Sequence, residues 1–414
     1  MAASSNDLET CPALFSPQFQ FDPYPTYRRH LAGPRLQPME ARPGVWMLFG
    51  YEACATVLRD ARLSSTRPPH VLVAVADDAM VEFEDLIRHM QRWLLLRDAP
   101  RHSKLRKLMN PGFMPSVIEH LRHRVEAIID GLLDNMRGAE TIDLIKDFSY
   151  PLPVRVICEL LGLPEELHAR CVVLSNEIAV WFGDIRRPAE SARVAQKAIL
   201  ELEGYFAEII RERRAARKED LLSVLMDAAD VAGGLAEEDL LAQCVMLLFA
   251  GHETTRNLIG NGIFTLLKHP QAMAELRGDD ELWQPAVEEL LRYETPVQGF
   301  GRTVKSELEI DGTKLPPGSS ILFMIGAAHR DPRQYAHPDD LDLRRLHNRH
   351  LAFGGDAHVC LGSTLARLEG RLSIRAVVRR FPDLRLADDT PDWGSNFAFR
   401  GLNTLRVGCR SSGS

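Results

Sequence analysis

The clearest pattern in this 414-residue chain is a spacing of three or four positions between apolar residues through its central part. Such spacing places apolar side chains on one face of a helix. The longest predicted helix, roughly Ala236–Lys268, is apolar on most faces around Val245–Phe249, so we expect it inside the protein. The same spacing predicts further helices at Pro100–Leu108, Pro115–Arg137, Val154–Leu161, Glu165–Phe182, Ala189–Lys218, Leu221–Ala229, Gln271–Leu276 and Leu282–Tyr293.

The two ends of the chain show other patterns. Near the start we expect a short helix, a β-hairpin and a second helix, at Pro25–Leu31, Arg35–Phe49 and Tyr51–Arg59. After Pro296, β-type runs separated by turn residues occur at Gly301–Lys305, Leu308–Ile310, Ile321–Phe323 and within 384–407. Residues 60–95 read as a long mixed loop. We therefore predict one mainly α domain with small β-sheets over residues 1–414, with an irregular arm at 1–21 and a flexible tail at 408–414.

Composition and charge narrow the class of protein. The hydrophobic fraction of 45% and the charged fraction of 26% are ordinary for a soluble globular protein. A net charge of −7 argues against nucleic-acid binding. Seven scattered cysteines without CxxC spacing suit a reducing compartment. Because apolar runs are too short for a membrane span and the start lacks a signal-peptide pattern, we expect a cytoplasmic protein without a membrane or nucleic-acid partner.

A glycine-punctuated stretch, Phe353–Gly362, presents Cys360 immediately before a helix-forming sequence. Unpaired N–H groups and the helix dipole favour negative charge there, which would bias the cysteine toward the metal-ligating thiolate. The glycines would let the backbone approach a flat cofactor. Our hypothesis is that Cys360 is the axial ligand of a haem iron. The alternative is a turn residue or a buried free thiol, and the stretch alone leaves the two equally supported.

The segment Ala250–Thr255, in the middle of the long predicted helix, combines several features that disfavour a helix. Gly251 costs about 1 kcal/mol relative to alanine, two threonines are restricted at χ1, and Glu253 is an acid in an apolar setting. Together they suggest a functional distortion such as a widened turn, with a hydroxyl and a carboxyl that could pass protons. The alternative, favoured by this segment alone, is a kink with Thr254 bonded to the preceding turn.

Two shorter motifs place charges on one helix face. Glu289 and Arg292 are three residues apart, so they could form a buried structural ion pair joined by another arginine, or an exposed pair of little value. His102 and Arg106 are four residues apart and could bind an anionic group. For this second pair the alternative is a solvated basic face.

Taken together, these motifs resemble the cytochrome P450 family of haem-thiolate monooxygenases, over roughly residues 22–407. The order and spacing carry the resemblance, through Asp98–Arg106, Ala250–Thr254, Glu289–Arg292, His329–Pro332, Asn348–Phe353 and the Cys360 stretch. The size is similar to that of the soluble bacterial members. The resemblance implies a monomer with haem b that uses O₂ to hydroxylate or epoxidise a small apolar substrate in secondary metabolism, with electrons from ferredoxin and ferredoxin reductase.

The resemblance also implies a role for each matching residue. Cys360 would be the thiolate ligand, Glu253 and Thr254 would deliver protons, and the haem propionates would be bound by His102, Arg106, Arg302 and His358. The structural ion pairs would join Glu289, Arg292 and Arg345. The substrate would contact Met246, Phe249, Ala250, Val297, Gln298, Ala398 and Phe399. Trp181 and Phe182 would lie nearby.

Some features depart from the family pattern or leave alternatives open. Asp356 stands where the family usually has glycine, and it adds negative charge to the face where an acidic ferredoxin would dock. Because Thr255 follows Thr254, the oxygen-activating hydroxyl could be displaced by one residue. The alternative functions are a peroxide-driven peroxygenase on the same scaffold and a haem-binding sensor without turnover.

Overall fold

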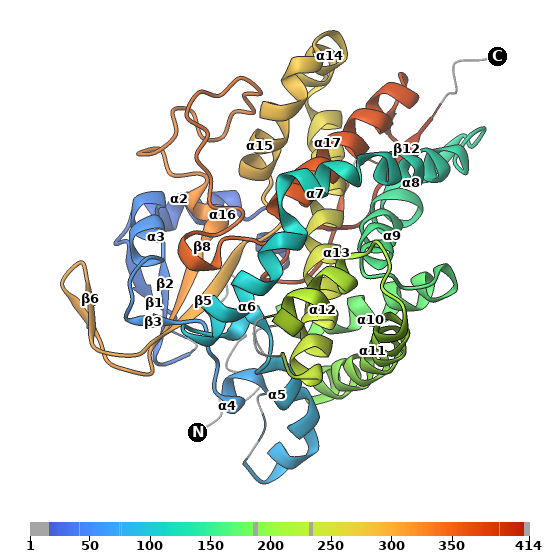
Figure 1. Ribbon diagram of the computed structural model, residues 1–414. Coiled ribbons are helices and arrows are strands. Elements are labelled where there is room, and N and C mark those ends of the chain that lie inside the picture. Colours follow the sequence, from blue (N-terminus) through green and yellow to red (C-terminus); the bar gives the residue numbers. More distant parts are fainter. Residues whose placement is uncertain are drawn as a thin grey trace.

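A computed structural model gives the fold, and it describes residues 16–40, 42–73, 75, 77–184, 189–231, 235–388 and 390–409. Helices form most of the molecule, and a β-sheet lies along one side (Figure 1). This confirms the mainly α fold with small sheets. The helices outside the centre are α1 (Pro17–Phe21), α2 (Tyr24–Leu31), α3 (Tyr51–Val57), α4 (Pro69–Leu72), α5 (Glu84–Met90), α6 (Arg101–Met109), α7 (Pro115–His120), α8 (Arg122–Asp134), α12 (Leu221–Val231), α14 (Pro270–Gly278) and α16 (Ile325–Ala328).

Helix α13 (Glu237–Lys268) crosses the middle of the molecule and is surrounded by other helices (Figure 1). Its apolar residues Val245–Phe249 are all buried, as the sequence predicts. Burial on most faces explains why its apolar positions form no narrow stripe. The helices packed against it are α9 (Pro151–Leu160), α10 (Glu165–Gly183), α11 (Ala189–Ala215), α15 (Trp283–Tyr293) and α17 (Ser363–Arg380).

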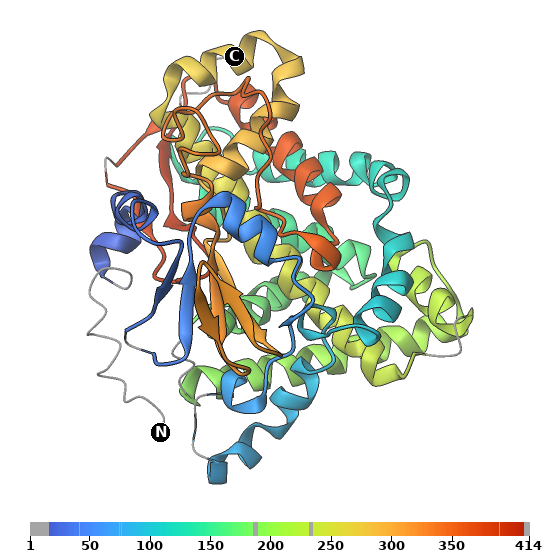
Figure 2. The same ribbon diagram turned by 90° about the vertical axis from the view of Figure 1, so that its left-hand side faces the viewer.

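The main sheet joins strands from both ends of the chain. Its order is β1 (Leu36–Pro38), β2 (Val45–Leu48), β8 (Ser320–Met324), β5 (Gly299–Val304) and β3 (Leu63–Ser64). Strands β2 and β8 pair in parallel and the other neighbours are antiparallel, so early and late strands lie side by side (Figure 2). A three-stranded sheet has the order β4 (Thr141–Asp143), β12 (Arg406–Gly408) and β9 (Arg385–Leu386). One two-stranded sheet pairs β6 (Leu308–Ile310) with β7 (Thr313–Leu315). Another pairs β10 (Asp392–Trp393) with β11 (Leu402–Thr404).

Several boundaries differ from the sequence predictions. The expected arm at 1–21 contains α1, where Ser16 Oγ accepts a hydrogen bond from the backbone N–H of Phe19 at 3.0 Å. At the other end, Gly408 pairs with Thr141 and Arg385, so the expected tail begins within a strand. The rest of the arm and of the tail, residues 1–15 and 410–414, lies outside the described residues. The predicted loop at 60–95 contains β3, α4, α5 and a 3₁₀ turn, and a second 3₁₀ turn begins at Leu94. The predicted helix Pro115–Arg137 is interrupted at Leu121.

None of the helices in the described part of the chain has the length and apolar character needed to cross a membrane.

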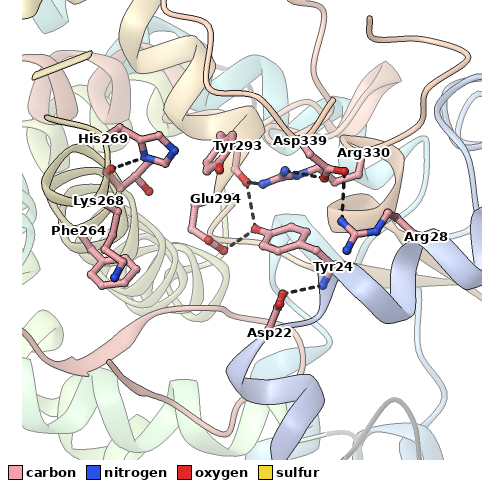
Figure 3. A pocket seen from close by; sticks show the side chains of 11 residues that line it. Asp22, Tyr24, Arg28, Phe264, Lys268, His269, Tyr293, Glu294, Arg330 and Asp339 are labelled. Atoms are coloured by element: carbon pink, nitrogen blue, oxygen red, sulfur yellow. Dashed lines mark hydrogen bonds and ion pairs between the residues drawn. The ribbon is translucent and has the colours of Figure 1, made fainter. Parts of the chain in front are cut away.

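A polar pocket of about 340 Å³ beside α2 shows how the N-terminal helices are attached to the rest of the fold (Figure 3). Tyr24 donates a hydrogen bond to Oε1 of Glu294 at 2.6 Å. Arg28 and Arg330 both reach Asp339, at 3.1 and 2.9 Å. Because these charged groups pair with one another, we interpret the pocket as part of the framework.

Candidate functional site

Cys360 lies in a short loop between a 3₁₀ turn, Asp356–His358, and the start of α17. Its backbone N–H donates to the carbonyl oxygen of Phe353 at 2.8 Å, which closes the loop. Among the cysteines that the structure describes, Cys54, Cys158, Cys171, Cys244 and Cys409 are buried and Cys360 alone is exposed. Cys360 is therefore the described thiol that a large ligand could reach.

The acidity of the Cys360 thiol differs from the sequence prediction. The protein atoms packed around it raise its pKa above the usual value, and the Gly362 N–H, Arg106 and Arg367 lower it only in part. The prediction that the loop biases the free thiol toward thiolate is therefore wrong. Since a coordinating thiol loses its proton to the metal ion, the thiolate required of a ligand would come from metal binding itself.

Two histidines and one arginine gather beside this loop. The rings of His102 and His358 lie 4.0 Å apart between centroids, and Ser65 Oγ is 3.1 Å from His358 Nε2. His102 Nε2 is buried and has no hydrogen-bond partner in the described part of the chain. Burial lowers the pKa of His358 to about 3, with added repulsion from Arg302 and His102. Burial likewise lowers the pKa of His102 and of Arg302. Burial and mutual repulsion both indicate a site that would gain from an anion.

Arg106 is placed differently from its predicted role. Its Nη1 donates to the backbone oxygen of Val359 at 2.6 Å, and its Nε donates to Asn110 Oδ1 at 3.0 Å. Arg106 therefore supports the cysteine loop from α6 in this structure. Arg97, which the sequence analysis did not select, has a buried Nε without a partner among the described residues, and burial lowers its pKa. Its position directly before the Asp98–Arg106 motif could have identified Arg97 from the sequence.

These residues fit a haem with a thiolate axial ligand. A haem combines a flat apolar ring, an iron with an affinity for thiolate, and two propionate carboxylates. The exposed Cys360 could supply the ligand atom, and donors without acidic partners among the described residues, on His102, Arg302 and His358, would suit the propionates. The glycine-bordered loop adds little side-chain bulk beside the ring.

Helix α13 is regular through its central motif. The α-helical hydrogen bonding is continuous from Glu237 to Lys268, so the predicted widened turn is wrong. Thr254 Oγ1 donates to the carbonyl oxygen of Ala250 at 3.0 Å, which is the alternative that the sequence analysis kept open. Ala250 is exposed, and Gly251 and Thr254 are partly exposed, whereas the surrounding residues are buried. The middle of a core helix therefore has one accessible face.

Glu253 is held by partners on its own helix. Arg256 Nη1 donates to its Oε2 at 3.0 Å, and Asn257 Nδ2 donates to its Oε1 at 3.2 Å. Arg256 also donates to the backbone oxygen of Leu402 at 2.9 Å. This pairing removes most of the expected cost of a buried acid and explains why the helix needs no distortion. The sequence analysis missed Arg256, although its three-residue spacing from Glu253 was visible.

The structure brings Glu289, Arg292 and Arg345 together in a buried group. Arg292 donates two hydrogen bonds of 2.7 Å to Glu289, and Arg345 Nε lies 3.2 Å from both carboxylate oxygens. Arg292 also donates to the carbonyl oxygens of His329, Pro338 and Asp340, at 2.8 to 3.0 Å. Every charge has a partner, so this group fixes α15 to the irregular segment before the cysteine loop.

Most residues predicted to line the substrate site are brought together. Phe249 and Phe399 lie 6.4 Å apart between ring centroids, and Phe182 lies 5.1 Å from Phe249 and 6.4 Å from Phe399. Val297 forms a β-bridge with Phe399, and the Gln298 N–H donates to the Ala398 oxygen at 2.8 Å. On α13, Met246 is buried one turn before Ala250. We call Phe182, Phe249 and Phe399 the aromatic group.

Gln298 is the exception in this set. Its side-chain Oε1 accepts from the hydroxyl of Tyr27 at 2.7 Å, and its Nε2 donates to the Thr295 oxygen at 2.8 Å. Both ends of the amide are used in buried contacts toward the N-terminal helices. The prediction that Gln298 faces the substrate is therefore wrong. The alternation of side-chain direction along an extended segment could not reveal the contact with Tyr27. Trp181 is also buried, with its ring 6.3 Å from that of Phe182.

Comparison with known proteins agrees with this geometry. The family model described as Cytochrome P450 matches residues 178–393. Cytochrome P450 monooxygenase PikC of Streptomyces venezuelae is 41% identical, over 94% of this chain and 91% of its own length. The 6-deoxyerythronolide B hydroxylase of Saccharopolyspora erythraea is 35% identical, over 97% and 99%. The chain belongs to the cytochrome P450 family.

Solved structures show the same relationship. P450BioI, in complex with an acyl carrier protein ligated to hexadec-9Z-enoic acid, superposes with a TM-score of 0.87 at 33% identity and covers 95% of this chain and 100% of its own. PksS, the cytochrome P450 of the Bacillus subtilis 168 bacillaene polyketide synthase, gives 0.86 at 32% identity, with coverages of 95% and 98%. The protein is therefore a haem-thiolate monooxygenase, which uses a substrate, O₂ and electrons from a redox partner.

Proposed function

We propose that this enzyme hydroxylates or epoxidises a small apolar organic substrate in bacterial secondary metabolism. The observation that carries the proposal is the aromatic group beside the accessible face of α13, where Ala250 and Thr254 are exposed or partly exposed. Apolar rings at this position would hold and desolvate an apolar substrate. Two relatives support the same class: PksS, which is named for polyketide biosynthesis, and a hydroxylase named for 6-deoxyerythronolide B.

We assign the cofactor as haem b with Cys360 as its axial ligand. His102, Arg302 and His358 would bind the propionates, and Arg106 would hold the cysteine loop through Val359. Haem b would supply the oxidising chemistry, and its thiolate ligand favours cleavage of the O–O bond. Ferredoxin and ferredoxin reductase are the proposed electron donors, acting on a monomer in the cytoplasm.

We assign proton delivery to Thr254 and Glu253. The Thr254 hydroxyl lies on the accessible face of α13, where its oxygen can hold a water molecule. The Glu253 carboxylate, one residue earlier, is oriented by Arg256 and Asn257 and would pass protons to that hydroxyl through water. Thr255, by contrast, is only 3% exposed, which favours Thr254 as the working hydroxyl.

The ligand assignment is tested by replacing the sulfur. Cys360→Ser should abolish the red-shifted Soret band of the reduced CO complex, because the thiolate would be absent. The matched control is Cys409→Ser, which removes a thiol from the end of β12 and should leave the band unchanged. A Cys360→Ser protein that kept the band would refute the assignment.

The function is tested by the pair Thr254→Val and Thr255→Val, which remove adjacent hydroxyls at equal volume. With ferredoxin, reductase and a substrate that shifts the Soret band, Thr254→Val should uncouple NADPH consumption from product and release peroxide, since its hydroxyl holds water. Thr255→Val should remain coupled, and the reverse result would move the role to Thr255.

The wild-type enzyme in the same assay separates the proposed function from its alternatives. Turnover with hydrogen peroxide but not with ferredoxin would identify a peroxygenase. The absence of any product would identify a sensor.

A further inference from the structure

One arginine is placed against the aromatic group and has no acidic partner in the part of the chain that the structure describes. Arg67 follows β3, and its guanidinium carbon lies 5.4 Å from the ring centroid of Phe182. Phe182 is at the C-terminal end of α10 and reaches Phe249 on α13 and Phe399 near the C-terminus. Arg67 therefore borders the rings that we assign to the substrate.

The charge of Arg67 has no direct counter-charge among the described residues. The side chain is partly buried, and within the described part of the chain no hydrogen bond or ion pair engages its guanidinium. Four buried arginines here have a carboxylate of their own: Arg213 with Asp220, Arg256 with Glu253, Arg292 with Glu289 and Arg400 with Glu294. Arg67, like Arg302, has no such carboxylate among the described residues.

Electrostatics near Arg67 increase the need for a negative charge. Burial lowers its pKa to about 10, and repulsion from Arg302 acts in the same direction. It nevertheless remains a cation at neutral pH, since its pKa is well above 7. A contact with an aromatic ring compensates only part of the lost hydration of a cation. A carboxylate beside Arg67 would restore the missing counter-charge with charge-assisted hydrogen bonds.

Arg67 lies close enough to Arg302 to feel its charge, so a haem propionate is the competing source of that carboxylate, and it is the contact with Phe182 that favours the substrate. The donors of His102, Arg302 and His358 already suit the propionates. Arg67 instead stacks on a ring of α10, which contributes no residue to that set of donors. Its position therefore joins a cation to an apolar surface, which matches an amphipathic acid.

We propose that Arg67 binds a carboxylate of the substrate, so that the enzyme selects acids with an apolar body over their neutral analogues. This inference rests on the proposed function and names the substrate class of that site. The guanidinium would fix one end of the substrate by a two-point contact, and the aromatic group would cover the rest. The distance from the carboxylate would then select which carbon is presented for oxidation.

The test compares three probes that differ only at one end: dodecanoic acid, its methyl ester and 1-dodecanol. Each is titrated into the holoenzyme while the Soret band is recorded. The wild type should bind the acid at least about tenfold more tightly than the ester or the alcohol. Arg67→Leu should abolish this preference, and Arg67→Lys should keep part of it. Arg62→Leu is the matched control, since Arg62 is on the surface with Asp60 as its partner, and it should keep the full preference.

Several results would overturn the proposal. The first is an acid that binds the wild type no better than the ester, whether both bind or neither does. The second is Arg67→Leu weakening all three probes equally. The third is Arg67→Leu losing haem while keeping the preference for the acid, which would assign Arg67 to a propionate.

Quenching of tryptophan fluorescence provides a second readout of acid binding, because the Trp93 ring lies 6.1 Å from that of Phe182. Acid-selective quenching without product formation would support the carboxylate site and refute the proposed function. Product formation without acid selectivity would support the proposed function and refute the carboxylate site.

Discussion

Two arginine-rich regions of this molecule differ in how their charges are balanced. Around Glu289, the carboxylate accepts hydrogen bonds from Arg292, Arg345, Asn348 and the backbone N–H of Asp342. Around the cysteine loop, no ion pair with a carboxylate engages His102, His358 or Arg302 in the described residues. The first region pairs its charges directly, whereas in the second Asp98 and Asp356 act on the cations through space without forming an ion pair with them.

This difference separates arginines that build the fold from those that bind a ligand. A buried charge is stable only with a partner, so a cation that has none within the protein indicates a partner from outside. The loss of an internal partner should therefore destabilise the fold. The loss of an unbalanced cation should weaken ligand binding and leave the polypeptide intact.

The largest effect is expected in the balanced region. Glu289→Gln should lower the free energy of unfolding by about 3–5 kcal/mol, because it leaves Arg292 and Arg345 buried without a counter-charge. Urea unfolding of the apoprotein measures this directly. Glu238→Gln removes an exposed partner of Arg92 and should cost less than about 1 kcal/mol. Equal effects of the two substitutions would contradict the structural role of Glu289.

An intermediate effect is expected at Arg302, on the ligand side of the comparison. Arg302→Leu should reduce haem affinity by about 10- to 100-fold, the value of a charge-assisted hydrogen bond. The apoprotein should unfold at the same urea concentration as the wild type, or a higher one, because an unbalanced buried charge has been removed. Transfer of haem to apomyoglobin measures the first quantity. An apoprotein as unstable as Glu289→Gln would place Arg302 in the framework instead.

The smallest effect is expected at Glu288, which lies between the two regions. Burial works against its negative charge, but bonds from His350 and Arg367 lower its pKa to about 2, from a usual value of 4.5. Arg367 in turn stacks on Phe353, whose carbonyl holds the Cys360 N–H. A carboxyl with a lowered pKa stabilises the fold above its unfolded pKa, and this stability is lost as pH falls from about 4.5 toward 2.

Glu288→Gln tests this contribution. The wild type should be more stable than Glu288→Gln by about 1 kcal/mol at neutral pH, because solvent screens a pair in which Glu288 is 26% and Arg367 is 41% exposed. Thermal unfolding from about pH 7 to 3.5 should show the difference shrinking below pH 4.5. A difference that stayed constant with pH would mean that packing, and not charge, sets the role of Glu288.

Features that depend on neighbouring residues were predicted well from the sequence. Helical periodicity located α13, and three-residue spacing paired Glu289 with Arg292, because both signals act within one or two turns. Arg345 entered only through the family resemblance, since no local rule links residues 56 positions apart.

The wrong predictions have a common physical cause. The widened turn was inferred from the combined cost of Gly251, two threonines and an unpaired Glu253, but Arg256 supplies the counter-charge of Glu253. The lowered pKa of Cys360 was inferred from the helix start, but packing around the thiol outweighs it. Gln298 is oriented by Tyr27, a residue 271 positions away. In each case the outcome depends on residues that are close in space, and a single sequence does not show which residues these are.

Asp356 shows a feature that sequence reasoning located but did not explain. Its backbone φ of 59° lies in the left-handed region, where the usual glycine of the family would be unstrained. Its side-chain oxygen accepts the His358 N–H at 2.7 Å, which offsets the strain and holds the turn before Cys360.

Arg400 gives the N-terminal helices a role beyond packing. It donates to the backbone oxygens of Gln20 and Phe21 and to Glu294, and it directly follows Phe399 of the aromatic group. Helix α1 thus supports, from outside, the turn that presents Phe399. A fusion partner, a shortened N-terminus or an antibody bound at these helices would alter how widely the substrate site opens. Changes at the N-terminal helices should therefore alter the range of substrates accepted without changing any residue that contacts the substrate.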